Sequence, residues 1–148
     1  MSTFFKFIVL STILIFGTSC SNPKEKKTVI VPKKITYLFL TQPSCPSCER
    51  LEESMNLAKP KALLSKYFDV KKVYLGEKLP DTVIEPNGTP TVYFLGANDE
   101  VLVEPMVGEK EESALVQFLE DALYEFNVTY HVDLVKKYNE KNNTTTTL

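Results

Sequence analysis

The sequence predicts an α/β fold with a central mixed four-stranded sheet, built from a βαβ unit followed by a ββα unit and flanked by helices. Three observations lead to this prediction. Residues 35–40 form a short run of apolar, aromatic and β-branched side chains, which is typical of a strand buried on both faces. From Cys45 to Ala58 the apolar residues recur at three- and four-residue steps, as one helix face requires. Residues 91–95 and 100–103 are strand-like runs separated by a turn, which indicates a hairpin.

Size and composition narrow the range of functions. The chain has 148 residues, of which 43% are hydrophobic, enough for one ordinary core. Its 17 Lys and Arg are balanced by 19 Asp and Glu, so it has no basic field to hold nucleic acid, and we expect no such partner. Three cysteines and one histidine, His131, argue against a disulfide scaffold, a metal site and a histidine-based triad. We therefore expect cysteine chemistry without a metal or another cofactor.

The N-terminus has the layout of a signal peptide. One cation, Lys6, precedes an apolar run over residues 7–16, and small residues then lead to Cys20. A helix that spans a bilayer takes about 20 apolar residues, and this run is shorter. We expect residues 1–19 to be a signal peptide and residues 20–33 to be a polar tether.

This N-terminus resembles that of bacterial lipoproteins, whose signal peptides end before a cysteine that is lipidated. Thr18, Ser19 and Cys20 fit the pattern, whereas Gly17 stands where the family usually has leucine. The resemblance implies a protein exported in a bacterium, periplasmic or at the cell surface, and anchored to a membrane by a lipid on Cys20. Ordinary cleavage after Ser19 is the alternative.

The first helix should begin at Ser44 or Cys45. Pro46 would then lie in its first turn, where the missing N–H costs nothing. Pro60 should end or kink this helix, and residues 60–67 should form a further helical turn or two. Residues 70–75 are expected to be the second strand.

The second half of the domain should contain the hairpin and a final helix. Pro105 has no N–H to donate, so the strand over residues 100–103 should lie at a sheet edge or break there. Apolar residues at helical spacing from Leu115 to Phe126 follow an acidic stretch, which suits a helix N-terminus. We therefore place one domain at residues 34–128. A C-terminal extension at 129–148 would contain a short helix over 131–138 and a disordered end over 139–148.

Cys45-Pro46-Ser47-Cys48 comes directly after the predicted central strand and opens the predicted helix. A helix N-terminus offers unpaired N–H groups and about half a positive charge, which can lower the pKa of a thiol from about 8.5 to between about 3.5 and 7.5. Cys45 is then the nucleophile. Cys48 lies one turn further, less exposed, where it can attack a mixed disulfide held on Cys45.

Together with Gly88-Thr89-Pro90-Thr91 before the third strand, this motif resembles the thioredoxin superfamily over about residues 35–126. The resemblance implies a thioredoxin-like fold and a cis peptide between Thr89 and Pro90, and it assigns substrate binding to these two residues. It also implies a thiol–disulfide oxidoreductase, a reversible Cys45–Cys48 disulfide and protein disulfides or dithiols as substrates. Thr89, before the proline, resembles the residue of the reducing and isomerising members more than that of the strong oxidases, so the resemblance favours a reductase. A reductase would need an electron donor, such as a membrane transporter of reducing equivalents.

The sequence departs from thioredoxin itself in three places. Ser44 replaces a tryptophan, and Phe39 replaces a buried aspartate that helps proton transfer, so deprotonation of Cys48 must use another group or water. Residues 76–89 are short for the usual intervening helix, which we expect to be a single turn or absent.

Other interpretations of the cysteine pair stay open. A zinc site would need two more ligands, and only His131 and Cys20 are available. A structural disulfide is the stronger alternative, in a binding module that holds a partner with the hairpin and the Pro90 loop. Copper delivery is weakened because Met55, Met106 and His131 have no clear metal spacing relative to Cys48. Separately, the stretches around Asn127 and Asn142 match an acidic sequon that resembles that of bacterial N-glycosylation systems.

Overall fold

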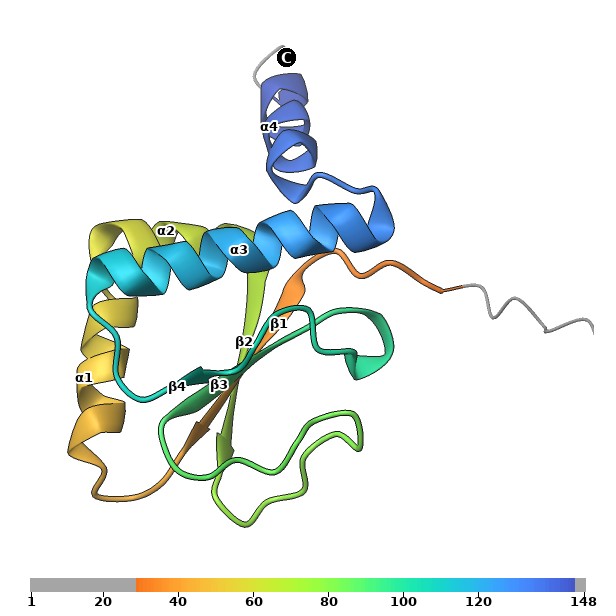
Figure 1. The fold of residues 1–148 in the computed structure, drawn as a ribbon. Coiled ribbons are helices and arrows are strands. Elements are labelled where there is room, and N and C mark those ends of the chain that lie inside the picture. Colours follow the sequence, from red (N-terminus) through yellow and green to blue (C-terminus); the bar gives the residue numbers. More distant parts are fainter. Residues whose placement is uncertain (1–28, 146–148) are drawn as a thin grey trace, which may run out of the picture.

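The computed structural model describes residues 29–145, so the expected signal peptide and Cys20 lie outside the described residues. The elements follow in the order β1 (Ile35–Thr41), α1 (Pro46–Met55), α2 (Ala58–Tyr67), β2 (Phe68–Tyr74), β3 (Thr91–Leu95), the 3₁₀ helix η1 (Ala97–Asp99), β4 (Met106–Val107), α3 (Glu112–Tyr130) and α4 (Leu134–Thr145), shown in Figure 1. Within the described residues, no helix is long and apolar enough to cross a membrane.

The sheet is mixed and four-stranded, as predicted, with the strand order β2-β1-β3-β4. β1 pairs in parallel with β2 and antiparallel with β3, and β3 pairs antiparallel with β4. β1 is central, and its side chains are buried on both faces except for the half-buried Thr36. The parallel pair needs a crossover, which α1 and α2 supply.

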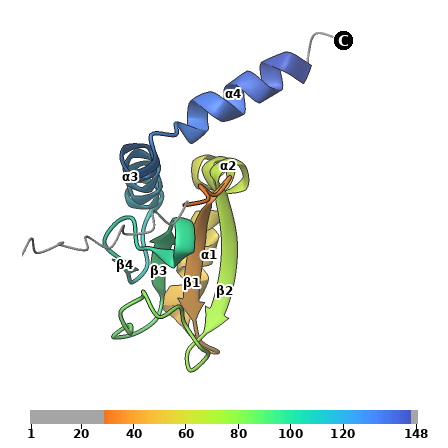
Figure 2. The ribbon, with the colours of Figure 1, turned by 90° about the vertical axis from the view of Figure 1, so that its right-hand side faces the viewer.

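One face of the sheet carries the main core. Alternate residues of the two central strands, including Tyr37, Phe39 and Phe94, pack against the buried sides of α1, α2 and α3. Figure 2 shows α1 behind the strands and α2 and α3 at one end of them. The helices form because their apolar residues recur on one side: Leu115, Leu119, Ala122 and Phe126 of α3 are all buried.

The opposite face carries a smaller core of Leu38, Tyr93 and Leu95. It is covered by the connection between β2 and β3, from which Leu79 and Val83 pack against it. The Tyr93 hydroxyl donates a hydrogen bond of 2.7 Å to the Ile84 carbonyl oxygen and ties the connection down. This connection forms no regular helix, so the intervening helix, expected to be one turn at most, is absent.

The fourth strand differs from the prediction. Residues 100–103 make a single bridge, between Val101 and Leu95, and regular pairing begins only at Met106, opposite Val92. The two pairings differ in register, so the chain bulges between them. Pro105, which has no N–H, lies in this bulge, and β4 follows it at the sheet edge.

The C-terminal extension is more ordered than expected. α3 continues to Tyr130, past the boundary predicted at residue 128, and α4 continues to Thr145. Disorder was therefore the wrong prediction for 139–145, while 146–148 lie outside the described residues. The polar sequence gives little signal for this helix, but Tyr138 packs edge-on against Tyr67 of α2, with ring centroids 5.6 Å apart.

Candidate active site

Cys45 is the N-cap residue of α1, and Pro46 occupies the first turn, as predicted. The preceding Ser44 has a left-handed backbone, with φ 55°, which turns the chain sharply from the strand end into the helix. The Cys45 Sγ accepts a hydrogen bond of 3.2 Å from the Cys48 N–H. The sulfur thus takes the place of the oxygen that usually caps a helix, at the positive end of the helix dipole.

Cys45 and Cys48 form a disulfide in this structure. Both residues are buried: Cys45 is 5% exposed and Cys48 is 2% exposed. The order of exposure is the one expected for a nucleophile and a resolving thiol, but the difference is small. In the oxidised state the pair is therefore largely enclosed, although both Ser44 and Pro46 beside Cys45 are exposed.

The proline loop faces Cys45. The Thr89–Pro90 peptide is cis, and the Thr89 hydroxyl lies 3.7 Å from the Cys45 Sγ. The loop is fixed on both sides, because the Thr91 hydroxyl donates to the Gly88 carbonyl oxygen at 2.7 Å and the Gly108 N–H donates to the Pro90 carbonyl oxygen at 2.8 Å. The structure therefore brings Cys45, Cys48, Thr89 and Pro90 together from two distant parts of the sequence.

Ser47 also belongs to the site, and sequence reasoning did not single it out. Its hydroxyl lies 3.5 Å from the Cys45 Sγ. The available signal was its place in the first turn, two residues after the cap, where a short hydroxyl side chain can reach back to the cap atom. The contacts of the sulfur are thus one backbone N–H and two hydroxyls, all of them neutral donors.

The surroundings of Cys48 are apolar. Cys48 belongs to the main core together with Phe39, which is 1% exposed, and Leu51, which is fully buried. Phe39 lies in β1 on the helix-covered face. Within residues 29–145, no group of three or more His, Cys, Asp or Glu side chains could hold a metal ion.

His131 lies apart from this site, at the C-terminal end of α3, where it is exposed and adopts a left-handed backbone with φ 55°. Cys20 lies outside the described residues.

A comparison with protein-family models found no match, and a comparison with curated proteins found none either. Solved structures do match. A disulphide isomerase from Xylella fastidiosa Temecula1 is similar with 21% identity and a TM-score of 0.46, over 60% of this chain and 77% of that one. The reduced form of SoxS, a periplasmic thioredoxin from Paracoccus pantotrophus, is similar with 18% identity and a TM-score of 0.47, over 62% of this chain and 98% of that one.

The topology itself settles the fold. A βαβ unit with the cysteine pair at its first helix precedes a ββα unit that a cis-proline introduces, and the strands follow in the order β2-β1-β3-β4. The fold of this chain is thioredoxin-like.

Proposed function

We propose that this protein is a thiol–disulfide oxidoreductase in which Cys45 attacks the substrate and Cys48 resolves the mixed disulfide. The observation that carries the proposal is the position of the Cys45 Sγ, which lies at the N-terminus of α1, bonded to the Cys48 N–H and facing Thr89. Each of these donors stabilises a thiolate more than a thiol, and the helix dipole acts in the same direction.

In the reduced protein, the Cys45 thiolate attacks one sulfur of a substrate disulfide. A Cys45–substrate disulfide forms, the substrate S–S bond breaks, and the leaving sulfur takes up a proton. Cys48 then loses its proton and attacks the Cys45 Sγ, which releases the second substrate thiol. The substrate gains two electrons and two protons, and the protein ends with the Cys45–Cys48 disulfide seen here.

The proline loop would hold the substrate during this exchange. Thr89 is half-buried and its hydroxyl is next to the reacting sulfur, which supports the proposal that its backbone pairs with an extended segment of the substrate. Pro90 is buried, and it leaves the loop no N–H at this position, so the backbone groups of Thr89 are the ones that remain for the partner.

We further propose that the protein acts as a reductase. A strongly oxidising dithiol requires strong stabilisation of its reduced form. The donors around the Cys45 Sγ are neutral, and hydrogen bonds from neutral donors are about half as strong as those from charged ones. A reductase must be re-reduced after each turnover, so it needs an electron donor, for which we propose a membrane transporter of reducing equivalents.

Export and anchoring through a lipid on Cys20 complete the proposal. The support is the signal-peptide layout of residues 1–19 and the small residues before Cys20. Intact-mass measurement of the protein from native membranes should give the chain from Cys20 with an added diacylglyceryl and acyl group. A mass equal to the unmodified chain from Cys20 would contradict the anchor and leave the redox proposal untouched.

The redox proposal is tested by reduction of insulin disulfides with dithiothreitol as the electron source. We expect the wild type to accelerate the reaction and Cys45→Ser to give the uncatalysed rate. Cys48→Ser, first reduced and then mixed with insulin after the dithiothreitol has been removed, should accumulate a mixed disulfide on Cys45. Ser54→Ala, a change on the same helix away from the sulfurs, is the matched control and should keep the wild-type rate. Equal rates of insulin reduction for the wild type and Cys45→Ser would contradict the proposed redox function.

A structural disulfide is the second candidate, and the 5% exposure of Cys45 is the observation that favours it. The reduction potential separates the two functions. A catalytic pair should equilibrate with glutathione or thioredoxin-range buffers, above about −300 mV, whereas a structural bond lies below that value. Reduction of a structural bond should also lower the stability, by about 2 kcal/mol for so short a loop, without any change in insulin reduction.

A further inference from the structure

A group of positively charged side chains lies away from the cysteines. A hollow of about 410 Å³ opens between the segment before β1, the last turn of α2 and α4. Its lining includes five exposed lysines: Lys33, Lys34, Lys66, Lys137 and Lys141. The whole chain has a net charge of −2, so this basic cup, as we call the hollow with its lysines, is a local feature and not a consequence of composition.

The base of the cup is apolar and aromatic. Tyr67, Leu134 and Tyr138 contribute to it, and the Lys66 Nζ lies 5.6 Å from the centre of the Tyr138 ring. The lining contains no carboxylate. Asp133, just before α4, accepts a hydrogen bond of 2.9 Å from the Lys136 N–H. The cup therefore suits a ligand with negative charge outside and apolar groups beneath.

The segment before β1, which leads to the cup, contains exposed apolar residues. Ile30 is 85% exposed and Val29 is 48% exposed, and Lys33 and Lys34 follow within a few residues. Exposed aliphatic side chains next to lysines are typical of segments that lie at a membrane interface. In such segments the apolar groups lie among the acyl chains and the cations lie at the headgroups.

We propose that the basic cup is the face with which this domain contacts the membrane, and that the headgroups of anionic phospholipids occupy it. This inference rests on the anchoring part of the proposed function. Val29 is the ninth residue after Cys20, a length that spans at most about 30 Å, so a lipid on Cys20 would hold this face close to the bilayer. The positively charged lysines are then attracted to the negatively charged membrane surface, an attraction that acts over about 10 Å.

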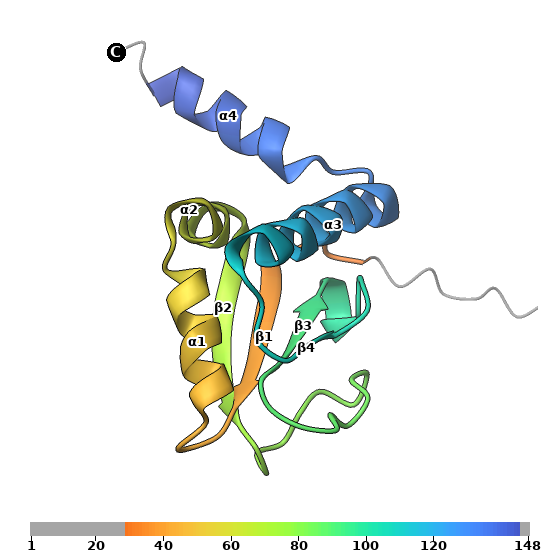
Figure 3. The same ribbon diagram turned by 60° about the vertical axis from the view of Figure 1, so that its left-hand side comes forward.

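The cup and the cysteines lie at opposite ends of β1. Lys34 directly precedes the first residue of β1, and Cys45 follows shortly after its last residue. The strand between them has seven residues, each of which adds about 3.3 Å to its length. Figure 3 shows α4 and the segment before β1 at one end of the domain and the start of α1 at the other. Docking through the cup would therefore turn the redox site away from the lipid, toward proteins in the surrounding compartment.

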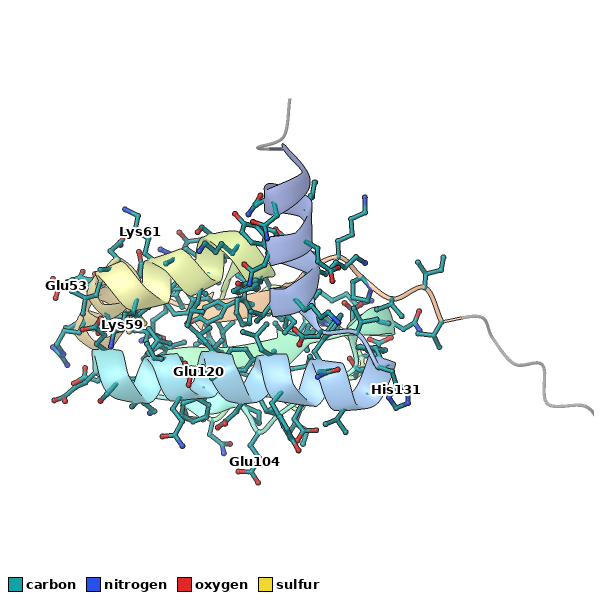
Figure 4. All side chains as sticks on the ribbon, turned by 90° about the horizontal axis from the view of Figure 1, so that it is seen from above. Glu53, Lys59, Lys61, Glu104, Glu120 and His131 are labelled. Carbon is teal, nitrogen blue, oxygen red and sulfur yellow. A yellow bond between two sulfur atoms is a disulfide. The ribbon has the colours of Figure 1, made fainter. Side chains whose placement is uncertain are left out.

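Lysine reactivity tests this orientation without any substitution. The protein purified from membranes with its native N-terminus is placed in vesicles of phosphatidylcholine alone or of phosphatidylcholine and phosphatidylglycerol in equal amounts, and each lysine is labelled with an amine-reactive ester. We expect Lys66, Lys137 and Lys141 to react at least about fivefold more slowly in the anionic vesicles, and salt should reverse the effect. Lys59 and Lys61, toward the other end of α2 in Figure 4, should react equally in both.

Charge reversal provides the second arm. The triple variant Lys66→Glu, Lys137→Glu, Lys141→Glu should remove the protection of Lys33 and Lys34 in anionic vesicles. The matched variant Lys59→Glu, Lys61→Glu, Lys71→Glu carries the same change in charge on other exposed positions and should keep it. Insulin reduction in solution should be unchanged in both variants, which shows that they fold and separates this test from that of the redox function.

Three outcomes would overturn the proposal: equal labelling of the cup lysines in both kinds of vesicle, equal protection of Lys59 and Lys61, or protection that appears only when another protein is added. The last would make the cup a protein interface. If the intact mass shows no lipid on Cys20, the anchoring proposal fails, and the same labelling with added vesicles still decides whether the cup binds anionic lipid.

Discussion

The two faces of the sheet are covered by different kinds of structure. Three helices cover one face, which carries the large buried aromatic residues such as Tyr37, Phe39 and Phe94. A connection without regular helix covers the other, where the buried core consists of Leu38, Tyr93 and Leu95. Figure 1 shows α1 and this connection on opposite sides of the strands.

In the proposed function, this difference would separate stability from substrate binding. The connection over residues 76–89 covers the face with the smaller core and ends in the Thr89–Pro90 peptide. The proline loop is therefore continuous with the irregular connection and not with the helices. Cys45 and Cys48 belong to the helix-covered face. We infer that the helices fix the sulfur atoms and that the connection can adapt to a substrate without disturbing the main core.

Phe94→Ala should cause the largest loss of stability. Phe94 is fully buried and stacks on Phe118 of α3, with ring centroids 6.4 Å apart, and meets Tyr37 edge-on at 5.5 Å. Loss of these contacts and the cavity left behind should lower the free energy of unfolding by about 3–5 kcal/mol. Urea unfolding followed by circular dichroism measures it. A smaller loss than that of Leu38→Ala would contradict the difference between the two faces.

Leu38→Ala tests the other face at a comparably buried position of the central strand. Leu38 is 4% exposed and packs with Tyr93 beneath the connection. We expect a loss of about 2–3 kcal/mol, the low end for such a substitution, because an irregular connection can settle into the space. If the loss reaches 5 kcal/mol, this face is packed as rigidly as the helical one.

Tyr37→Phe should stabilise the protein by about 1 kcal/mol. Among the described residues, the Tyr37 hydroxyl is a buried group without a hydrogen-bond partner, so removing it removes a desolvation cost. Burial also raises the pKa of Tyr37 above its usual value of 10.0 in the folded protein. Urea unfolding of the variant and wild type at pH 7 gives the difference, and a clear loss of stability would mean that the hydroxyl has a partner.

The same variant predicts a change at alkaline pH. As pH rises above 10, the unfolded chain releases the Tyr37 proton and the folded one keeps it, so stability is lost with rising pH. Burial raises the pKa of Tyr67 and Tyr93 in the same direction. Tyr37→Phe should therefore lose stability less steeply above pH 10 than the wild type, and parallel curves would contradict the assignment.

Val83→Ala should have the smallest effect on stability, about 0.5 kcal/mol, because Val83 is only half-buried on the loop-covered face. Its effect should instead appear as faster amide hydrogen exchange over residues 76–89, while exchange in α1 stays unchanged. Faster exchange in α1 as well would show that the two faces open together.

Much of the fold could be predicted because local patterns agree with the final packing. The helical spacing from Cys45 onward and the position of Pro46 located the start of α1 within one residue. The cis peptide before Pro90 followed from the resemblance alone, since most X-Pro bonds are trans. Predictions failed where tertiary contacts decide: β4 depends on a change of register, and α4 on Tyr138 packing against Tyr67. The Ser47 contact depends on a side-chain orientation that spacing does not fix.

The placement of the two ends of the described part of the chain, residues 29–145, has a practical consequence. The segment before β1 and helix α4 meet at the hollow lined by Lys33 and Lys137, at the end of the domain remote from Cys45. A fluorescent or affinity fusion at the C-terminus would leave the dithiol open to macromolecular substrates but would crowd the lysines. Immobilisation through the N-terminus on a sensor chip would present the cysteines to the flowing solution, in the orientation that the tethered molecule would adopt on a lipid surface.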